Sequence, residues 1–283
     1  TPLVAGEEAT KKVFGEYVSV YNFKESIIDE ATVPLYYENR IPELQLVNEN
    51  FNEDILKVIE EAELDEDAEK AIEQKFKTQY HLITRSERLD KIAEDVVQHF
   101  LGRGYQGKAM YVAIDRFTAI AMCEKVKIAW KAELDKLVSQ LPGASGPKKS
   151  ALQKKIEFMR SFDMAAIVSS SQNEIDDFRK RGIDIKPHRE RLVKEDLETT
   201  FKDPNSNLKL VFVCAMWITG FDCPTCSTVY LDKPMKNHTL MQTIARANRV
   251  AEGKDAGLIV DYIGVLKYLE DALAIYGPGK GRD

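Results

Sequence analysis

Short apolar runs alternate with longer amphipathic segments over most of the chain, and this alternation predicts the fold class. Five runs are almost wholly apolar and are typical of strands: residues 109–114, 165–168, 208–214, 227–231 and 257–262. The segments that follow them have the apolar spacing of helices: residues 116–137, 173–181, 187–201, 238–249 and 265–276. Apolar strands that alternate with helices predict an α/β fold, a mainly parallel sheet covered by helices on both faces.

The first hundred residues have a different pattern. Their early part mixes strand-like runs with turns and prolines, whereas the later part is helical, with one clear amphipathic helix at residues 88–100. The pattern therefore divides the chain into a tail or linker left from an upstream domain, a helical segment, an α/β domain and a C-terminal tail: residues 1–50, 51–105, 106–270 and 271–283.

Composition narrows the class of protein. The chain of 283 residues is 44% hydrophobic and 30% charged, which is typical of a globular protein, and its formal net charge is -6. That charge argues against a nucleic-acid-binding surface over the whole molecule but allows a local basic groove. No apolar run approaches the ~20 residues of a membrane span, and no signal peptide opens the chain. We therefore expect a cytoplasmic protein without a membrane partner.

The four cysteines raise the question of a metal site. Cys223 and Cys226 form a CxxC pair, to which Cys214 and His238 could add two ligands for zinc. The sequence has no second CxxC, and the pair follows a Gly-Phe-Asp turn instead of opening a helix. We therefore predict reduced thiols and no metal.

Three polar residues stand out on the apolar helix predicted for residues 238–249. Gln242, Arg246 and Arg249 are spaced at i, i+4 and i+7, which places them in one stripe on a helix. A guanidinium group forks onto phosphate oxygens, so this stripe predicts a phosphate site. Taken singly the residues have structural explanations: Thr239 and Gln242 fit a capping box, and arginines near a helix end oppose its dipole.

The loop after the strand at residues 208–214 carries a second candidate. Gly220 permits a tight backbone turn, and Asp222 can bond a ribose, a water or an arginine. Ligands of open parallel sheets bind at the carboxyl ends of strands, where we expect both this loop and Asp232 with Lys233. An ordinary loop between strands remains the alternative for Gly220 and Asp222 taken alone.

A complete nucleotide site also needs a phosphate cradle, and the sequence does not supply one. The Gly- and Lys-containing stretches at residues 143–150 and 277–280 both miss the spacing of a P-loop. We therefore expect this chain to contribute arginines to an ATP and Mg²⁺ site that another domain completes.

These motifs resemble a known family. Gly220-Phe-Asp-x-Pro224 followed by Gln242-x-x-x-Arg246-x-x-Arg249 is similar to motifs V and VI of superfamily 2 helicases and translocases. Three longer stretches resemble the motor (R) subunit of type I restriction enzymes: residues 216–224, 230–249 and 257–264. Outside them, residues 14–17, 31–40 and 94–100 also resemble that subunit, as do Thr1, Pro2 and Leu3, which are similar to residues just after motif III.

The resemblance implies a fold, an activity and partners. It implies the second RecA-like domain of an ATP-dependent double-stranded DNA translocase, which works with the first RecA-like domain and with methylation and specificity subunits. The whole enzyme would be a type I site-specific deoxyribonuclease, and this segment alone would be inactive. Two alternatives stay open: another superfamily 2 helicase or remodeller-like ATPase, and a non-catalytic adaptor that binds DNA or a partner.

The resemblance also implies roles for single residues. Arg246 and Arg249 would be catalytic arginine fingers, and Gln242, Gly220 and Asp222 would belong to the ATP site. Arg116 and Thr219 would contact the DNA backbone. Many superfamily 2 proteins have threonine at the position of Cys214, so we expect no DNA contact from this cysteine.

Overall fold

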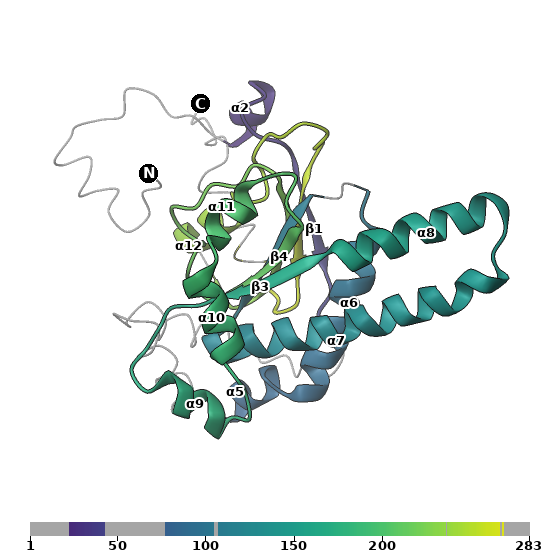
Figure 1. Cartoon of the computed structure of the whole chain (residues 1–283). Helices are drawn as coiled ribbons and strands as arrows, with labels where there is room; N and C mark the ends of the chain where they lie inside the picture. Colours follow the sequence, from purple (N-terminus) through teal and green to yellow (C-terminus); the bar gives the residue numbers. More distant parts are fainter. Residues whose placement is uncertain (1–22, 43–76, 105–106, 236, 267, 269–283) are drawn as a thin grey trace.

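A six-stranded sheet forms the centre of the molecule (Figure 1). The structure, a computed structural model, describes residues 23–42, 77–104, 107–235, 237–266 and 268. All neighbouring strands are parallel, in the order β1-β6-β5-β2-β4-β3. The strands are Leu35–Asn39 (β1), Lys108–Ala113 (β2), Asp163–Ile167 (β3), Leu208–Val213 (β4), Cys226–Asp232 (β5) and Gly257–Asp261 (β6).

Helices connect the strands and cover the sheet. They are Phe23–Ile28 (α2), Lys77–Ile83 (α5), Ser86–Gly102 (α6), Arg116–Gln140 (α7), the 3-10 helix Leu141–Gly143 (η1), Gly146–Ser161 (α8), Glu174–Lys180 (α9), Lys186–Lys194 (α10), Leu197–Lys202 (α11) and Asn237–Ile244 (α12). The predicted helix at residues 265–276 lies almost wholly outside the described residues.

The sheet separates two hydrophobic cores, as the alternation of side chains along a strand requires. On β2, Met110 and Val112 point into one core, whereas Tyr111 points into the other. The first core is covered by α11, α12 and the loop between β4 and β5, and the second by α6, α7 and α8. The predicted three-layer α/β architecture with a parallel sheet is confirmed, including all five strands.

The N-terminal part contributes to the same sheet. The sequence assigned residues 31–37 to a tail or linker, and the structure places β1 at the sheet edge, paired in parallel with β6 from Leu35 opposite Gly257. The predicted amphipathic helix is α6, and its apolar face, from Leu89 to Phe100, is buried against the sheet. The other predicted helices of the segment lie outside the described residues.

Residues 140–155 form part of a helical hairpin. After η1 the chain turns back as α8, which runs beside α7 and projects from the body of the domain (Figure 1). Trp130 of α7 stacks on Phe162 with ring centroids 4.0 Å apart, and its Nε1 donates to Met159 O at 3.0 Å. These contacts fasten the base of the hairpin.

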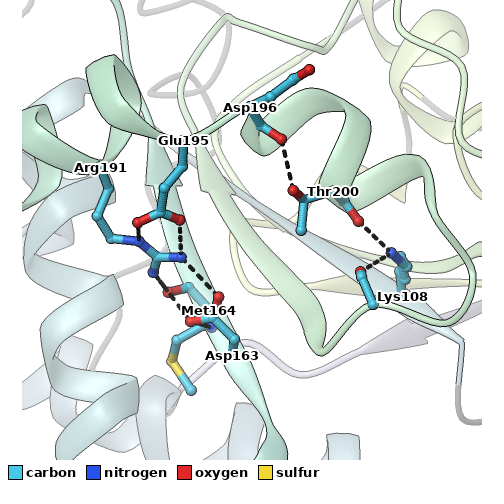
Figure 2. A network of polar contacts seen from close by, with 8 residues as sticks. Lys108, Asp163, Met164, Arg191, Glu195, Asp196 and Thr200 are labelled. Carbon is cyan, nitrogen blue, oxygen red and sulfur yellow. Dashed lines mark hydrogen bonds and ion pairs between the residues drawn. The ribbon is translucent and has the colours of Figure 1, made fainter.

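The helix predicted at residues 187–201 is divided in two. It ends as α10 at Lys194, and Asp196 then begins α11 by accepting a hydrogen bond from Thr199 N at 3.0 Å. Figure 2 shows the polar contacts that hold both helices to the sheet. Arg191 of α10 donates to both oxygens of Asp163 at the start of β3, and Lys108 Nζ of β2 donates to Thr200 O of α11 at 3.2 Å.

A buried ion pair joins α6 to the centre of the sheet. Arg88 Nη2 lies 2.6 Å from Asp232 Oδ1, and the two side chains are 1% and 0% exposed. Arg88 also donates to Tyr262 O at 2.9 Å, and Tyr111 Oη donates to Asp232 Oδ2 at 2.7 Å. Burial lowers the pKa of Arg88, but the Asp232 carboxylate outweighs that effect and the net shift is upward. Each partner therefore depends on the other for its place in the core.

In the part of the chain that the structure describes, no helix combines the length and the apolar character needed to cross a bilayer.

We expect Asp232→Asn to lower the free energy of unfolding by about 3–5 kcal/mol, because it leaves the Arg88 charge buried without a counter-charge. Urea unfolding of the purified chain measures this loss. The matched control is Asp135→Asn, which breaks an exposed ion pair with Lys131 and should cost less than about 1 kcal/mol. Equal losses in the two variants would contradict the structural role of the buried pair.

Candidate functional site

The connection from β4 to β5 determines where the site residues lie. Both strands run in the same direction, so residues 214–225 must return across the sheet from its carboxyl end to its amino end. The loop starts beside the carboxyl ends of the strands, where Lys233 Nζ donates to Cys214 O at 3.1 Å. It ends at the amino ends, where Lys108 N donates to Thr225 O at 2.8 Å. No helix lies in this connection, so the loop itself covers the sheet.

Two residues in this loop have left-handed backbone conformations. Gly220 has φ 70°, which glycine adopts without steric cost. Trp217 has φ 67°, an unfavourable value for a bulky residue. Its ring stacks on Phe221 with centroids 4.4 Å apart and an interplanar angle of 4°, and it also stacks on Phe201. The aromatic stack holds this turn against the first core.

The predicted arginine helix ends earlier than expected. α12 stops at Ile244, and the chain then tightens, with hydrogen bonds from Arg246 N to Thr243 O and from Ala247 N to Ile244 O. Arg249 forms an isolated antiparallel bridge with Thr32. The prediction that Gln242, Arg246 and Arg249 form one helical stripe is therefore wrong. The pairing with the segment before β1 takes the place of the last helical turn.

The turn brings Arg249 to the loop between β4 and β5. Arg249 Nη1 lies 3.4 Å from Asp222 Oδ1, and the two side chains are 43% and 56% exposed. Arg246 is half-buried, and its Nε donates to Gln242 O at 3.1 Å. Burial lowers the pKa of Arg246, the neighbouring charge of Arg249 lowers it further, and Asp222 raises it. Asp222 is thus ion-paired with Arg249 and acts on Arg246 only through its charge, so two guanidinium groups lie near one carboxylate.

Lys254 adds a third cation and fixes the end of the loop. Its side chain is buried, and its Nζ donates to Pro224 O at 2.9 Å and to Cys226 O at 2.8 Å. Burial lowers the pKa of Lys254 to about 8, while the nearby Cys226 and Cys223 raise it. Lys254 therefore ties the segment after Arg249 to the residues just after Asp222.

The arginines lie at the end of the sheet opposite to the one that the sequence suggested. Arg249 pairs with Thr32, which lies just before the start of β1. Ala247 lies against the start of β6, because a side chain at Gly257, the first residue of that strand, would come 2.2 Å from Ala247 O. The expectation of a site at the carboxyl ends is corrected here, because the loop crosses the sheet before it reaches Asp222. Asp232 and Lys233, at the carboxyl end, are buried in contacts with Arg88 and Cys214.

The predicted DNA contacts lie on other elements than the arginines, whereas Gln242 is on α12 and accepts the Arg246 hydrogen bond through its carbonyl. Arg116 begins α7 and is 4% exposed, so its side chain contacts protein in this structure. Asp115 before it caps α7 by accepting from Thr118 N at 2.6 Å. Thr219 is exposed in the crossing loop, and Gln242 is partly buried on α12. The structure therefore leaves Thr219 as the accessible member of the predicted DNA-binding pair.

The cysteines of the CxxC pair face different backbone carbonyls. Cys223 Sγ lies 3.4 Å from Phe201 O, and Cys226 Sγ lies 3.8 Å from Thr228 O. Cys214 Sγ contacts Ile114 O at 3.7 Å, and its side chain is buried. The side chain of His238 is outside the described residues. Each thiol is thus packed as part of the core.

Sequence reasoning missed three residues that shape the site or its support. Arg88 gave a signal, because a charge on the apolar face of an amphipathic helix needs a partner. Trp217 and Lys254 gave none, because their roles depend on a backbone conformation and on two carbonyl groups that only the folded loop brings together.

Comparison with known proteins identifies the family. The family model for type I restriction enzyme subunit R domain 3 matches residues 147–264, and the model for the SWI2/SNF2 ATPase matches residues 1–71. A protein named as the endonuclease subunit of type I restriction enzyme MjaIXP, from Methanocaldococcus jannaschii, is 35% identical over 286 residues. The chain belongs to the R-subunit family of type I restriction enzymes. The HindI endonuclease subunit of Haemophilus influenzae is also 35% identical, over 289 residues.

This R-subunit chain matches both relatives over 100% of its own length but spans 24% of theirs. A solved fragment of an HsdR subunit of a type I restriction enzyme from Vibrio vulnificus YJ016 superposes with a TM-score of 0.54 at 16% identity. That match covers 96% of this chain and 39% of the fragment, and it supports the shared fold.

We expect the unfolding free energy of the R-subunit chain to rise, relative to Lys254→Met, as the pH increases from about 8 to 10.5. The unfolded chain holds this proton with a pKa of 10.5 and the folded chain with a pKa of about 8, so the unfolded state binds more protons in that window. Urea unfolding of both proteins at the two ends of the window measures the difference.

The control for this pH dependence is Lys131→Met, at an exposed lysine on α7. Ionisation of groups away from Lys254 affects all three proteins and cancels in the comparison. If the difference in unfolding free energy between wild type and Lys254→Met stayed constant from about pH 8 to 10.5, the lowered pKa of a buried Lys254 would be contradicted.

Proposed function

We propose that this chain is the second motor domain of an ATP-dependent double-stranded DNA translocase, and that it supplies Arg246 and Arg249 to an ATP site completed by an upstream domain. The observation that supports the proposal most is the meeting of Asp222 with Arg249 beside Arg246. Family membership adds that the relatives are named as restriction enzyme subunits, and this chain spans 24% of their length.

The residues present fit a phosphate better than a complete nucleotide. Arg249 keeps about two-fifths of its side chain exposed, so part of its guanidinium can meet a ligand held by a facing domain. ATP, bound with Mg²⁺, supplies the phosphoryl group that passes to water. Arg246 and Arg249 would bind its oxygens and stabilise the charge that develops on them, an effect that reaches about 10³–10⁵ in rate for such arginines.

Asp222 makes the partner of Arg249 depend on whether a phosphate is bound. Its ion pair holds Arg249 in position, and at 3.4 Å between partly exposed groups this contact is weak. A phosphate competes with Asp222 for the same guanidinium group. Because Asp222 lies in the loop that also carries Gly220 and Thr219, exchange of partners at Arg249 would move that loop.

The loop suggests how ATP use reaches DNA. It runs from the carboxyl end of the sheet at Cys214, through Thr219, to the amino end at Asp222 and Thr225. We propose that Thr219 contacts the DNA backbone. Arg116, 4% exposed at the start of α7, would have to turn outward to make the same contact. Methylation and specificity subunits would supply the choice of DNA site.

We expect Arg249→Ala in the full-length protein to reduce ATP turnover at least about 10³-fold, because it removes a donor to the transferring phosphoryl group. Assembly of the DNA complex, measured by native gel or sedimentation, should be unchanged. Arg179→Ala, which removes an exposed arginine on α9, is the matched control and should keep full turnover. Wild-type turnover in Arg249→Ala would refute the assignment.

Two further measurements separate the alternatives. The 283-residue chain alone should show no ATP turnover, and measurable turnover would mean that it carries a phosphate cradle of its own. The full-length protein should displace a triplex strand without separating the duplex, which distinguishes a translocase from a helicase. Strand separation would favour the helicase alternative.

A further inference from the structure

A cysteine, a glutamate and a histidine meet on the other side of the sheet from Arg249. Cys123 and Glu124 are neighbours on α7, and His188 lies near the start of α10. The Sγ, carboxylate oxygen and imidazole nitrogen of the three all lie within 4.8 Å of one another. His188 Nε2 is 2.9 Å from Glu124 Oε1.

The cluster is partly enclosed. Cys123 is fully buried and His188 is 5% exposed, whereas the Glu124 side chain is 50% exposed. The structure shows no hydrogen bond of the Cys123 thiol among the described residues, although the other three cysteines each contact a carbonyl oxygen. A soft donor thus faces two harder donors, and Glu124 leaves a route to solvent.

We propose that Cys123, Glu124 and His188 form a binding site for a divalent transition-metal ion, with Zn²⁺ the best match. Zinc takes thiolate, imidazole and carboxylate ligands at about 2.0–2.3 Å, so the donors of a tetrahedral site lie about 3.3–3.7 Å apart. The present arrangement needs movements of about 1 Å, which side-chain rotation supplies. A water on the open side of Glu124 completes the tetrahedron.

The charges and protons of the site balance on binding. The thiol of Cys123 loses its proton to solvent, and His188 coordinates through Nε2 with its single proton moved to Nδ1. Thiolate and carboxylate then neutralise the two charges of the ion. Lys127 lies 2.8 Å from Glu124 Oε1 and must turn away, which its 39% exposure allows. Arg191 and Asp163 are also near Cys123 and offset one another.

The ion would connect two elements that the chain otherwise joins loosely. α7 belongs to the hairpin, and α10 leads through α11 into β4. Besides the His188–Glu124 contact, α10 is held by Arg191 at the start of β3 (Figure 2) and by Arg189, which binds Glu174 and the carbonyl of Val168. A metal at the cluster would fasten α10 to α7, away from the proposed ATP site and independent of it.

Titration of the metal-free 283-residue chain with Co²⁺ tests the site. We expect one equivalent to bind and to produce the thiolate-to-cobalt charge-transfer band, which Zn²⁺ then removes by displacement. Cys123→Ala should abolish the band. Glu124→Gln, at a half-exposed position that still accepts the His188 hydrogen bond, should weaken Zn²⁺ binding by at least about tenfold.

The matched control is the double variant Cys223→Ala/Cys226→Ala, which removes the CxxC pair and should keep the band. Absence of a band in the wild-type chain would overturn the proposal. So would a band that survives Cys123→Ala or disappears in the double variant. Equal Zn²⁺ affinity of Glu124→Gln and wild type would show that Glu124 serves only its contact with His188.

Discussion

The site depends on one constraint: β4 and β5 are parallel, and the connection between them contains no helix. β4 and β5 start at the same end of the sheet, so residues 214–225 must cross one face of it. The loop therefore serves as a covering layer, held by the stack of Trp217 on Phe221 and by Lys254 at its end. The same crossing carries Asp222 from the carboxyl end to the amino end, where Arg249 lies. One segment thus covers the sheet and carries the acidic residue of the proposed site.

Electrostatics distinguishes the two ends of this segment. At the carboxyl end, Asp232 and Arg88 are buried and ion-paired with each other, so they fix the sheet to α6. At the amino end, Arg246 and Arg249 lie near one carboxylate, which is ion-paired with Arg249, and both remain partly exposed. An acidic chain that keeps an excess of positive charge at one place is suited to bind an anion there.

Periodicity was sufficient to predict the strands, because residues such as Val211 and Val229 lie in runs that are buried on both faces. It also predicted α6, whose apolar face is regular. It could not predict that α12 ends at Ile244, because contacts between Asn248 and Val33, distant in sequence, replace the last turn. Motif resemblance predicted only that Asp222 and Arg249 belong to the same site. The position of their contact at the amino end of the sheet depends on the path of the loop, which the sequence pattern does not reveal.

The central claim is that Arg246 and Arg249 complete an ATP site across a domain interface. The most direct measurement is a structure of the full-length protein with ADP, Mg²⁺ and a metal-fluoride mimic of the transferring phosphoryl group. The account predicts at least one of the two guanidinium groups within hydrogen-bond distance of the mimic, about 3 Å. Both guanidinium groups pointing to solvent, with the mimic contacted by other residues of the facing surface, would contradict it.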